Sequence, residues 1–377
     1  MFLDFQNFSI FLLVVFILFG LSSLVQLMYY WGVFRKLAFY KSKQKTVETP
    51  AVSVVICAKN EFYNLKQNLP IILKQDYPDF EVVLVNDNSN DKTAELLEDM
   101  KNENSHLKVV NLTQNLNFFS GKKFPLSIGI KSAKNEILLL TDADCKPNSS
   151  KWIRQMVSGF NSETDIILGY SPYIKEKGLL NSLIRFDTLF VAIQYLSYSL
   201  IRKTYMGVGR NLAYKKSMFY KNNGFSSHYK IQSGDDDLFI NSVATKTNTS
   251  IEIRPESHTF SKASSTFSQW FNQKSRHLST SKYYKRKFKF LLGTYSFSQL
   301  FFFTSFIILL FHSFGFYIVI ATYLLRLISQ LFIIKKCMNQ LKEKELLLLS
   351  PLFEILFIIL NILFMISAIM FKQNKWK

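Results

Sequence analysis

Four apolar segments, each long enough to cross a bilayer, constrain this 377-residue chain more than any other feature. The first spans residues 9–31 without a charge, and the others span 290–311, 314–334 and 346–371. Crossing the hydrocarbon core takes about 20 apolar residues. The first segment has no basic region before it and no small-residue cleavage site after it, which favours an anchor over a signal peptide. The chain is therefore expected to be an integral membrane protein.

Basic residues border these segments and indicate which side of the membrane each border faces. Five lie between Arg35 and Lys45, and five more between Lys282 and Lys289. The positive-inside rule makes both regions cytoplasmic and leaves Met1 outside. Three C-terminal crossings would leave Lys377 outside, but the basic tail favours the inside, so the side of this end stays open. The net charge of +19 therefore belongs to the membrane borders, and we do not expect nucleic-acid binding.

Short apolar runs alternate with helix-like stretches between residue 50 and about residue 170. Such alternation is typical of a mostly parallel, doubly wound sheet. We therefore expect an α/β, Rossmann-like, cytoplasmic domain flanked by transmembrane helices. The expected strands are 52–58, 81–85, 107–112, 137–140 and 166–169, and the expected helices are 61–74, 92–101 and 122–134.

Two aspartates, Asp142 and Asp144, directly follow the strand expected at 137–140. Ligands of open α/β sheets bind at the carboxyl ends of strands, which places both acids at a binding site. Neighbouring carboxylates repel each other unless a cation offsets their charge, and hard divalent cations bind carboxylates together with substrate phosphates. The alternative is a solvated turn, where aspartate is common. Taken alone, the two acids favour the solvated turn, so the rest of the chain has to decide.

Other polar residues are expected at the same edge of the sheet. Asp87 ends the second strand, where it can accept a hydrogen bond from a base or ribose, whereas Asp91 is explained as a helix cap. Lys122 and Lys123 follow Gly121 at a helix N-terminus, which suits a diphosphate. The glycine spacing of a Walker loop is absent from this stretch.

Two stretches further along the chain add candidate residues. Gly207 and Gly209 permit close backbone approach to a ligand, and Asn211 offers an amide. Residues 235–237 are three consecutive aspartates. They either stabilise a helix N-terminus through its dipole or supply a general base for an incoming hydroxyl.

Residues 265–278 predict an amphipathic helix on the membrane surface, with Phe267, Trp270 and Phe271 at helical spacing. The expected domain organisation follows from these segments. It comprises an anchor and linker (1–49), a catalytic domain (50–262), an interfacial segment (263–289) and C-terminal transmembrane helices (290–377).

These motifs together resemble glycosyltransferase family 2, the inverting enzymes of GT-A fold, over residues 52–277. Residues 54–61 resemble the opening strand and nucleotide-binding loop, and residues 86–91 are similar to Asp-Asp-x-Ser-x-Asp, with Asn86 replacing the first acid. Asp142-Ala-Asp144 matches the metal motif, and Ser233-Gly-Asp-Asp-Asp237 the later acidic doublet. Residues 273–277 are similar to the Gln-x-x-Arg-Trp signature of membrane synthases, with His277 in place of Trp.

The resemblance implies roles for individual residues. Asp87 would bind the uracil, and Asp144 would contact the cation, Mg²⁺ or Mn²⁺. Asp236 would act as the catalytic base, with Asp235 as the less favoured choice. The other residues implied at the substrate site are Ala58, Glu61, Lys122, Lys123, Asp142, Asn211, Gln273, Arg276 and His277.

The function implied by the resemblance is sugar transfer from a nucleotide-sugar, expected to be a UDP-sugar, to a lipid or lipid-linked glycan. The expected location is a bacterial inner membrane. His277 at the tryptophan position favours a single transfer over a processive polysaccharide synthase. A membrane-tethered nucleotide-sugar binding protein without turnover would use Asp87 but not Asp236. His277 either shapes the acceptor side or lies on the surface of the interfacial helix.

Arg326 and Glu354 are the clear ionisable residues deep inside the last two apolar segments. A charge left in hydrocarbon costs at least about 2.5 kcal/mol. Arg326 lies eight residues before Ile334 and Glu354 eight residues after Leu346, so both reach similar depth in an antiparallel hairpin. We therefore expect them to pair, or to converge on a common polar site beneath the catalytic domain. The alternative is a snorkelling Arg326 and a protonated Glu354.

Overall fold

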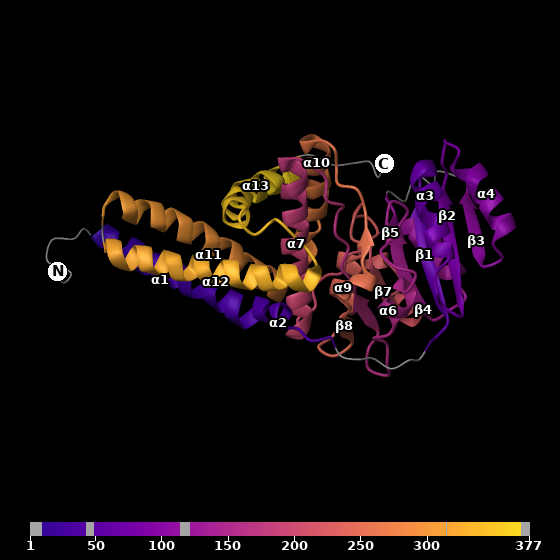
Figure 1. Ribbon diagram of the computed structural model, residues 1–377, viewed down its shortest axis with the longest axis horizontal. Coiled ribbons are helices and arrows are strands. Elements are labelled where there is room, and N and C mark those ends of the chain that lie inside the picture. Colours follow the sequence, from indigo (N-terminus) through magenta and orange to yellow (C-terminus); the bar gives the residue numbers. More distant parts are fainter. Residues whose placement is uncertain (1–9, 43–48, 114–120, 314, 371–377) are drawn as a thin grey trace. The chain divides into compact units, whose positions relative to one another are not determined.

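The computed structural model describes residues 10–42, 49–113, 121–313 and 315–370 (Figure 1). The chain divides into two compact units. Of the described residues, those in 10–40 and 285–366 form the helical unit, and those in 41–284 and 367–370 form the sheet unit. Some positions used above lie outside the described part of the chain, namely Met1, Ser9, Lys43, Lys45, Phe314, Phe371 and the tail 372–377.

The sheet unit is built on a seven-stranded sheet in the order β3-β2-β1-β4-β7-β6-β8. The strands are β1 (Val52–Ala58), β2 (Phe80–Asp87), β3 (Leu107–Leu112), β4 (Ile137–Asp142), β6 (Ile166–Leu168), β7 (Leu212–Lys215) and β8 (Thr249–Ile251). A separate two-stranded sheet joins β5 (Lys146–Pro147) to β9 (Thr259–Phe260). All five expected strands are present, and β5, β7, β8 and β9 are additions.

Strand register brings the candidate residues to one edge of the sheet. β1 pairs in parallel with both β2 and β4, with Ala58 opposite Asn86 and Cys57 opposite Asp142. Only β7 runs against its neighbours, β4 and β6, so four of the six strand pairs are parallel. The expected mostly parallel α/β sheet is therefore confirmed.

Apolar side chains explain why these segments form the centre of the unit. All seven residues of β1 are buried, as a strand covered on both faces requires. Gly129 of helix α5 (Lys123–Ser132) packs so closely that a Cβ there would lie 2.8 Å from the Val55 Cγ1 atom. The helices are α3 (Phe62–Leu73), α4 (Thr93–Glu103), α5 (Lys123–Ser132), α6 (Trp152–Val157), α7 (Leu179–Leu200), α8 (Lys216–Lys221), α9 (Asp237–Val243) and α10 (Phe267–Leu278), with 3₁₀ turns η3 (Ser226–His228), η4 (Pro255–Ser257) and η5 (Ser281–Tyr283).

Helix α7 was not expected, and it is apolar enough to count as a candidate membrane span. It belongs to the sheet unit, and 61% of its apolar window is buried inside the protein. It also carries Arg185 and Asp187, and Asp187 forms a 2.8 Å ion pair with Lys274 of α10. Burial against protein therefore accounts for the apolar composition of α7.

The helical unit contains the other four helices that are long and apolar enough to span a membrane. The first is α1 (Ile10–Met28), which continues through a π-helical turn (Tyr29–Phe34) into α2 (Arg35–Ala38). The others are α11 (Arg286–Phe311), α12 (Phe316–Leu341) and α13 (Ser350–Met370). Figure 1 shows α1, α11 and α12 side by side, and Phe19 of α1 stacks on Phe302 of α11 at 5.1 Å. These helices agree with the four expected spans.

Candidate functional site

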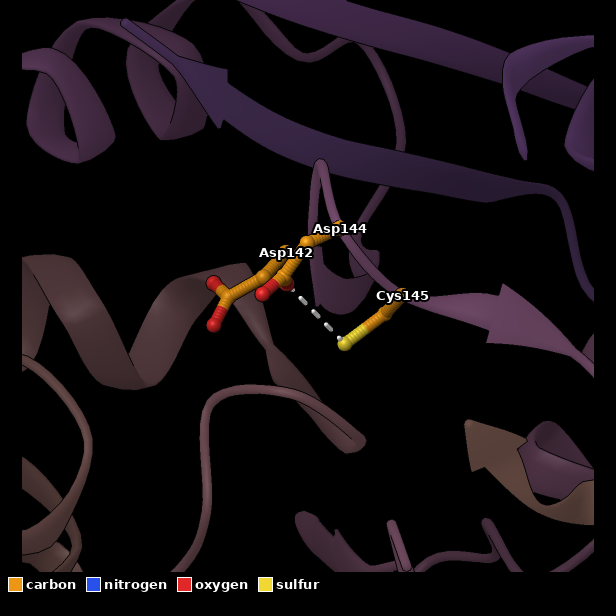
Figure 2. Close-up of side chains that lie close together, drawn as sticks. All are labelled: Asp142, Asp144 and Cys145. Atoms are coloured by element: carbon orange, nitrogen blue, oxygen red, sulfur yellow. Dashed lines mark hydrogen bonds between the residues drawn. The ribbon is translucent and has the colours of Figure 1, made fainter. Parts of the chain in front are cut away.

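The acids at the end of β4 form the centre of the candidate site. Asp142 is the last residue of β4, and Asp144 follows it in a tight turn (Figure 2). The Cys145 thiol points toward Asp144 and donates to its Oδ1 atom over 3.5 Å. One ligand atom from each of these three residues lies within 4.8 Å of the others. This is close enough for a shared ion.

The chemistry of these groups favours a hard divalent cation on carboxylate oxygens. Burial and the charges of Asp144 and Asp142 raise the pKa of Cys145 well above its ordinary value, so it remains a thiol and a poor ligand. Asp142 is already in an ion pair with Lys122. Both carboxylates can offer oxygen ligands to such an ion, and substrate phosphates can complete the set.

Lys122, the N-cap residue of α5, lies close to two acidic groups, Asp142 and Asp235. Its ammonium donates to Asp142 Oδ1. Burial alone would lower the pKa of Lys122, but the charges of Asp142 and Asp235 raise it above its ordinary value. Lys122 is therefore a fixed positive charge beside the metal motif, as a diphosphate-binding residue requires.

Lys123 is placed differently from its expected role. Its buried ammonium donates to the backbone carbonyls of His228 (2.8 Å), Ile231 (2.5 Å) and Ser233 (2.6 Å). A lysine has three N–H donors, so these contacts engage all of them. Lys123, which the sequence suggested as a residue that binds a diphosphate, therefore binds the protein's own backbone.

Residues at the ends of β1 and β2 surround the neighbouring part of the edge. Asp87 ends β2 and lies 3.4 Å from the Lys59 ammonium. Ala58 ends β1, and the buried Glu61 accepts a 2.6 Å bond from the Asn64 amide. Asp91 accepts from the Phe62 and Thr93 amides, which agrees with its reading as a cap. Ala58, Glu61 and Asp87 thus share one loop region next to Asp142.

Asn211 is a structural residue, contrary to its expected role in substrate binding. Its fully buried amide donates to the Tyr170 (2.9 Å) and Ser257 (2.8 Å) carbonyls, and its Oδ1 accepts from the Trp152 indole (3.1 Å). Gly209 likewise approaches protein, since a Cβ there would lie 3.3 Å from Asp236 Oδ2. An amide and a glycine in sequence do not reveal whether their partner is a ligand or the chain itself.

The three consecutive aspartates have three different environments. Asp236 caps α9, with its Oδ1 accepting from the Asp237 amide and its Oδ2 from the Gly209 amide, each at 2.7 Å. Asp237 is buried and accepts from the Thr280 hydroxyl and, over 2.7 Å, from the Tyr284 hydroxyl. Asp235 is partly buried, and among the described residues no hydrogen bond to its carboxylate is found.

Asp236 and Asp235 also differ in their electrostatic environments. Burial, together with the charges of Asp235 and Asp237, raises the pKa of Asp236 to about 8. Asp236 is therefore mostly protonated at neutral pH. The charge of Asp235 acts directly on Lys122, which places this acid near the metal motif.

Arg210 was not singled out from the sequence, although it lies between Gly209 and Asn211. Its guanidinium stacks over the Tyr173 ring at 4.3 Å and donates to Ser261 over 2.8 Å. Burial would lower its pKa, but Tyr173, Cys145 and the two acids of the metal motif raise it above its ordinary value. Arg210 is therefore a second fixed cation close to Asp142 and Asp144.

Helix α10 carries the remaining candidates, Gln273, Arg276 and His277. The side chain of His277 is exposed, while Gln273 and Arg276 are partly buried. Although its surface is exposed, His277 has protein on most sides, so desolvation, together with the cations Arg276, Lys274 and Arg210, lowers its pKa well below the ordinary value. His277 is therefore neutral at pH 7. Its electrostatic coupling to Arg210 and Asp142 places this end of α10 near the acidic centre.

Comparisons with known proteins agree with this geometry. Residues 53–222 match the model of Glycosyl transferase family 2. The chain is 26% identical over 257 residues to the probable glycosyltransferase YdaM of Bacillus subtilis, covering 66% of this chain and 59% of that protein. It is 34% identical over 111 residues to a poly-beta-1,6-N-acetyl-D-glucosamine synthase of Staphylococcus epidermidis, covering 29% of this chain and 25% of that protein. The chain thus spans less than two thirds of either relative.

The fold is also found in a solved structure. The mannosyltransferase PcManGT from Pyrobaculum calidifontis, in complex with GDP-Man and Mn²⁺, superposes with a TM-score of 0.59 at 17% identity, covering 89% of this chain and 99% of that chain. Residues 53–222 therefore form a glycosyltransferase family 2 domain, and the likeness to PcManGT supports its GT-A fold.

Proposed function

We propose that this membrane protein transfers a sugar from a nucleotide-sugar to a lipid or lipid-linked glycan, inverting the configuration at the anomeric carbon. The observation that carries the proposal is the position of Lys122. Its ammonium is paired with Asp142 of the metal motif, and the charge of Asp235 also acts on it. A diphosphate site and a candidate base therefore both lie near one fixed cation.

The donor side is assigned to the ends of β1 and β2. Asp87 can accept from a nucleobase, with Lys59 holding its carboxylate in place at 3.4 Å. The backbone at Ala58 and the turn at Glu61, where α3 begins, border the same region. PcManGT, which shares the fold, was solved with GDP-Man, and the resemblance to uridine-dependent members of the family favours a UDP-sugar here.

A divalent cation, Mg²⁺ or Mn²⁺, is assigned to Asp144, with Asp142 held beside it by Lys122. When bound, such an ion offsets the negative charge that develops on a departing diphosphate. Lys122 supplies fixed positive charge next to that position, and Arg276 and Arg210 supply more. These residues therefore favour departure of the nucleoside diphosphate.

Asp235 is assigned as the base, in preference to Asp236. Both Asp236 oxygens accept backbone N–H groups, and its raised pKa keeps it protonated at neutral pH. Asp235 can accept the proton of the acceptor hydroxyl as that oxygen bonds to the anomeric carbon. The bond from this carbon to the diphosphate oxygen breaks at the same time, and its electron pair leaves with the nucleoside diphosphate. One displacement with one base inverts the configuration.

The test is a screen of nucleotide-sugars with protein purified in detergent, with and without Mn²⁺, using membrane lipids as acceptors. We expect Mn²⁺-dependent transfer by the wild type and a loss of about 10³-fold in Asp235→Asn, with binding of the nucleoside diphosphate retained. Asp236→Ser, which keeps an oxygen to cap α9, serves as the matched variant and should lose less activity. Binding without transfer or hydrolysis of any donor would instead favour a binding protein.

A second candidate is processive polysaccharide synthesis. Its support is the relative from Staphylococcus epidermidis named as a poly-beta-1,6-N-acetyl-D-glucosamine synthase. His277 at the position of a tryptophan favours single transfer instead. Product length separates the two functions, since a processive enzyme releases long chains before all of the acceptor is used.

A further inference from the structure

The segment carrying the proposed base is held by the residue next to Lys122. We call residues 228–236 the base loop, because it joins η3 to α9 and contains Asp235. The Lys123 ammonium reaches its carbonyls at residues 228, 231 and 233 over 2.8, 2.5 and 2.6 Å. These acceptors span six residues of one loop, so a single side chain fixes the path of its backbone.

Two further contacts close the loop around this ammonium. Gly121 adopts a φ of +89°, and a Cβ added to it would lie 2.5 Å from the Gln232 carbonyl oxygen. The Nε2 atom of His228 lies 2.9 Å from the Gly234 carbonyl, and its Nδ1 lies 2.9 Å from the Ser227 hydroxyl. Burial and the Lys123 charge lower the pKa of His228 to about 4, so a neutral imidazole makes both contacts. The loop and the N-terminus of α5 thus fit each other closely.

The two adjacent lysines serve opposite sides of the site. Lys122 pairs with Asp142 of the metal motif, whereas Lys123 binds the base loop. The α5 N-terminus is therefore the point where the donor side and the acceptor side are connected. A shift of the base loop would move Asp235 relative to Lys122 and Asp142.

We propose that Lys123 is a positioning residue that holds the base loop against the N-terminus of α5 and thereby sets the position of Asp235. The inference rests on the proposed function and assigns Lys123 to the acceptor side of the reaction. A residue with this role affects turnover and leaves donor affinity intact. A diphosphate ligand would affect both.

The charges around Lys123 agree with a role in which it binds protein groups and no ligand. Burial lowers the pKa of Lys123 to about 8, against the opposing charges of Asp235, Asp237 and Asp236. Its ammonium is thus still mostly protonated at pH 7 and can engage three acceptors. The side chain is only 4% exposed, which leaves little surface for a ligand.

The experiment compares Lys123→Met with Lys131→Met in the full-length protein in detergent. The first keeps the aliphatic stem and removes the three donors, and the second changes an exposed lysine of the same helix. A misplacement of the base by about 1 Å costs about 100-fold in rate, so we expect kcat of Lys123→Met to fall by that amount. The affinity for UDP with Mn²⁺, measured by calorimetry, should stay within about twofold of wild type, and Lys131→Met should match wild type in both measurements.

Limited trypsin digestion tests the loop itself without any activity. Lys230 in the base loop and Lys221 at the end of α8 are both exposed. In Lys123→Met, cleavage after Lys230 should accelerate relative to cleavage after Lys221, and in Lys131→Met the ratio should match wild type. If wild type shows no transfer, the proposed function fails, and this digestion still decides whether Lys123 holds the loop.

The opposite results overturn the proposal. An unchanged kcat or an unchanged cleavage ratio in Lys123→Met would show that the loop is fixed without Lys123. If Lys123→Met lost UDP affinity as well as kcat, Lys123 would be a residue that binds the donor diphosphate. If Lys123→Met does not fold, Gly121→Ala gives the same test, because its Cβ must displace the Gln232 carbonyl while the lysine remains. Full activity in Gly121→Ala would then contradict the proposed positioning.

Discussion

Arg326 of α12 and Glu354 of α13 form a buried ion pair inside the helical unit. The guanidinium donates to both Glu354 oxygens and also to Gln26 Oε1 on α1, over 2.7 Å from its Nε atom. Glu354 in turn accepts from the Gln299 amide of α11 over 2.6 Å. Four helices that are long enough to span a membrane therefore meet at one polar cluster. The expected pairing of the two charges is confirmed.

The first prediction concerns the stability of this cluster. Removing one partner of a buried ion pair leaves the other charge uncompensated, which costs about 3 kcal/mol or more. Arg326→Gln and Glu354→Gln should each lower the melting temperature in detergent. The double variant should be more stable than either single variant, because amides at both positions can still bond to each other and to Gln26 and Gln299. Lys336→Met, at an exposed position of α12, serves as the control.

Thermal unfolding followed by circular dichroism provides the measurement. Strictly additive losses in the double variant would mean that the two residues act independently, against the pairing. A coupling energy near zero in the double-mutant cycle would likewise show that Arg326 and Glu354 do not interact.

The second prediction separates the two acids of the metal motif. Asp144→Ala should lose the Mn²⁺-dependent part of UDP binding, because Asp144 is the assigned oxygen ligand. Asp142→Ala should lose less, because Asp142 is already paired with Lys122 and its removal leaves that cation available to phosphate. Isothermal calorimetry with UDP, with and without Mn²⁺, is the measurement. Equal Mn²⁺ dependence in Asp144→Ala and wild type would refute the assignment.

Local patterns were sufficient to predict the strands and their shared edge. Short, mostly apolar runs such as 52–58 and 107–112 predicted β1 and β3 with the observed bounds. β7 was missed because its four residues, Leu212–Lys215, are too few to stand out in sequence and are placed by pairing with the distant β4 and β6. Short strands defined by long-range pairing leave little local signal.

Among the site residues, too, some positions were predictable from nearby sequence, whereas others depend on contacts with distant parts of the chain. Asp142 and Asp144 follow a strand, so their position at the sheet edge was predictable. Lys123 and Asn211 bind backbone carbonyls far away in sequence, and the residue type alone does not reveal such partners. The Arg326–Glu354 pair was predictable because a charge in a membrane span requires a partner and helix length fixes its depth.

The third prediction is a pH dependence that originates from Asp236. Its pKa is raised from 3.8 to about 8 in the folded protein, so the folded state keeps a proton that the unfolded state loses near pH 4. This contribution to stability is fully present below pH 3.8 and is lost as the pH rises toward 8. Asp236→Asn cannot ionise. The melting temperature of wild type relative to this variant should therefore fall between pH 5 and pH 8.

Glu98→Gln, an exposed change on α4, controls for general effects of charge. The new amide at position 236 mispairs with the Gly209 or Asp237 N–H group, which lowers stability by the same amount at every pH and leaves the slope interpretable. Parallel pH curves for wild type and Asp236→Asn would show that Asp236 titrates normally.

The last prediction concerns His277 and product length. The side chain is exposed on α10, is neutral at pH 7, and lies within electrostatic reach of Arg210 and Asp142. A tryptophan there adds a flat apolar face that can stack on an acceptor sugar, so His277→Trp should lengthen products or lower the acceptor KM. Asn272→Trp, at another exposed position of α10, controls for the added bulk. Chromatography of products formed with excess acceptor is the measurement. Unchanged product length and rate in both His277→Ala and His277→Trp would instead make His277 a surface residue with no part in acceptor binding.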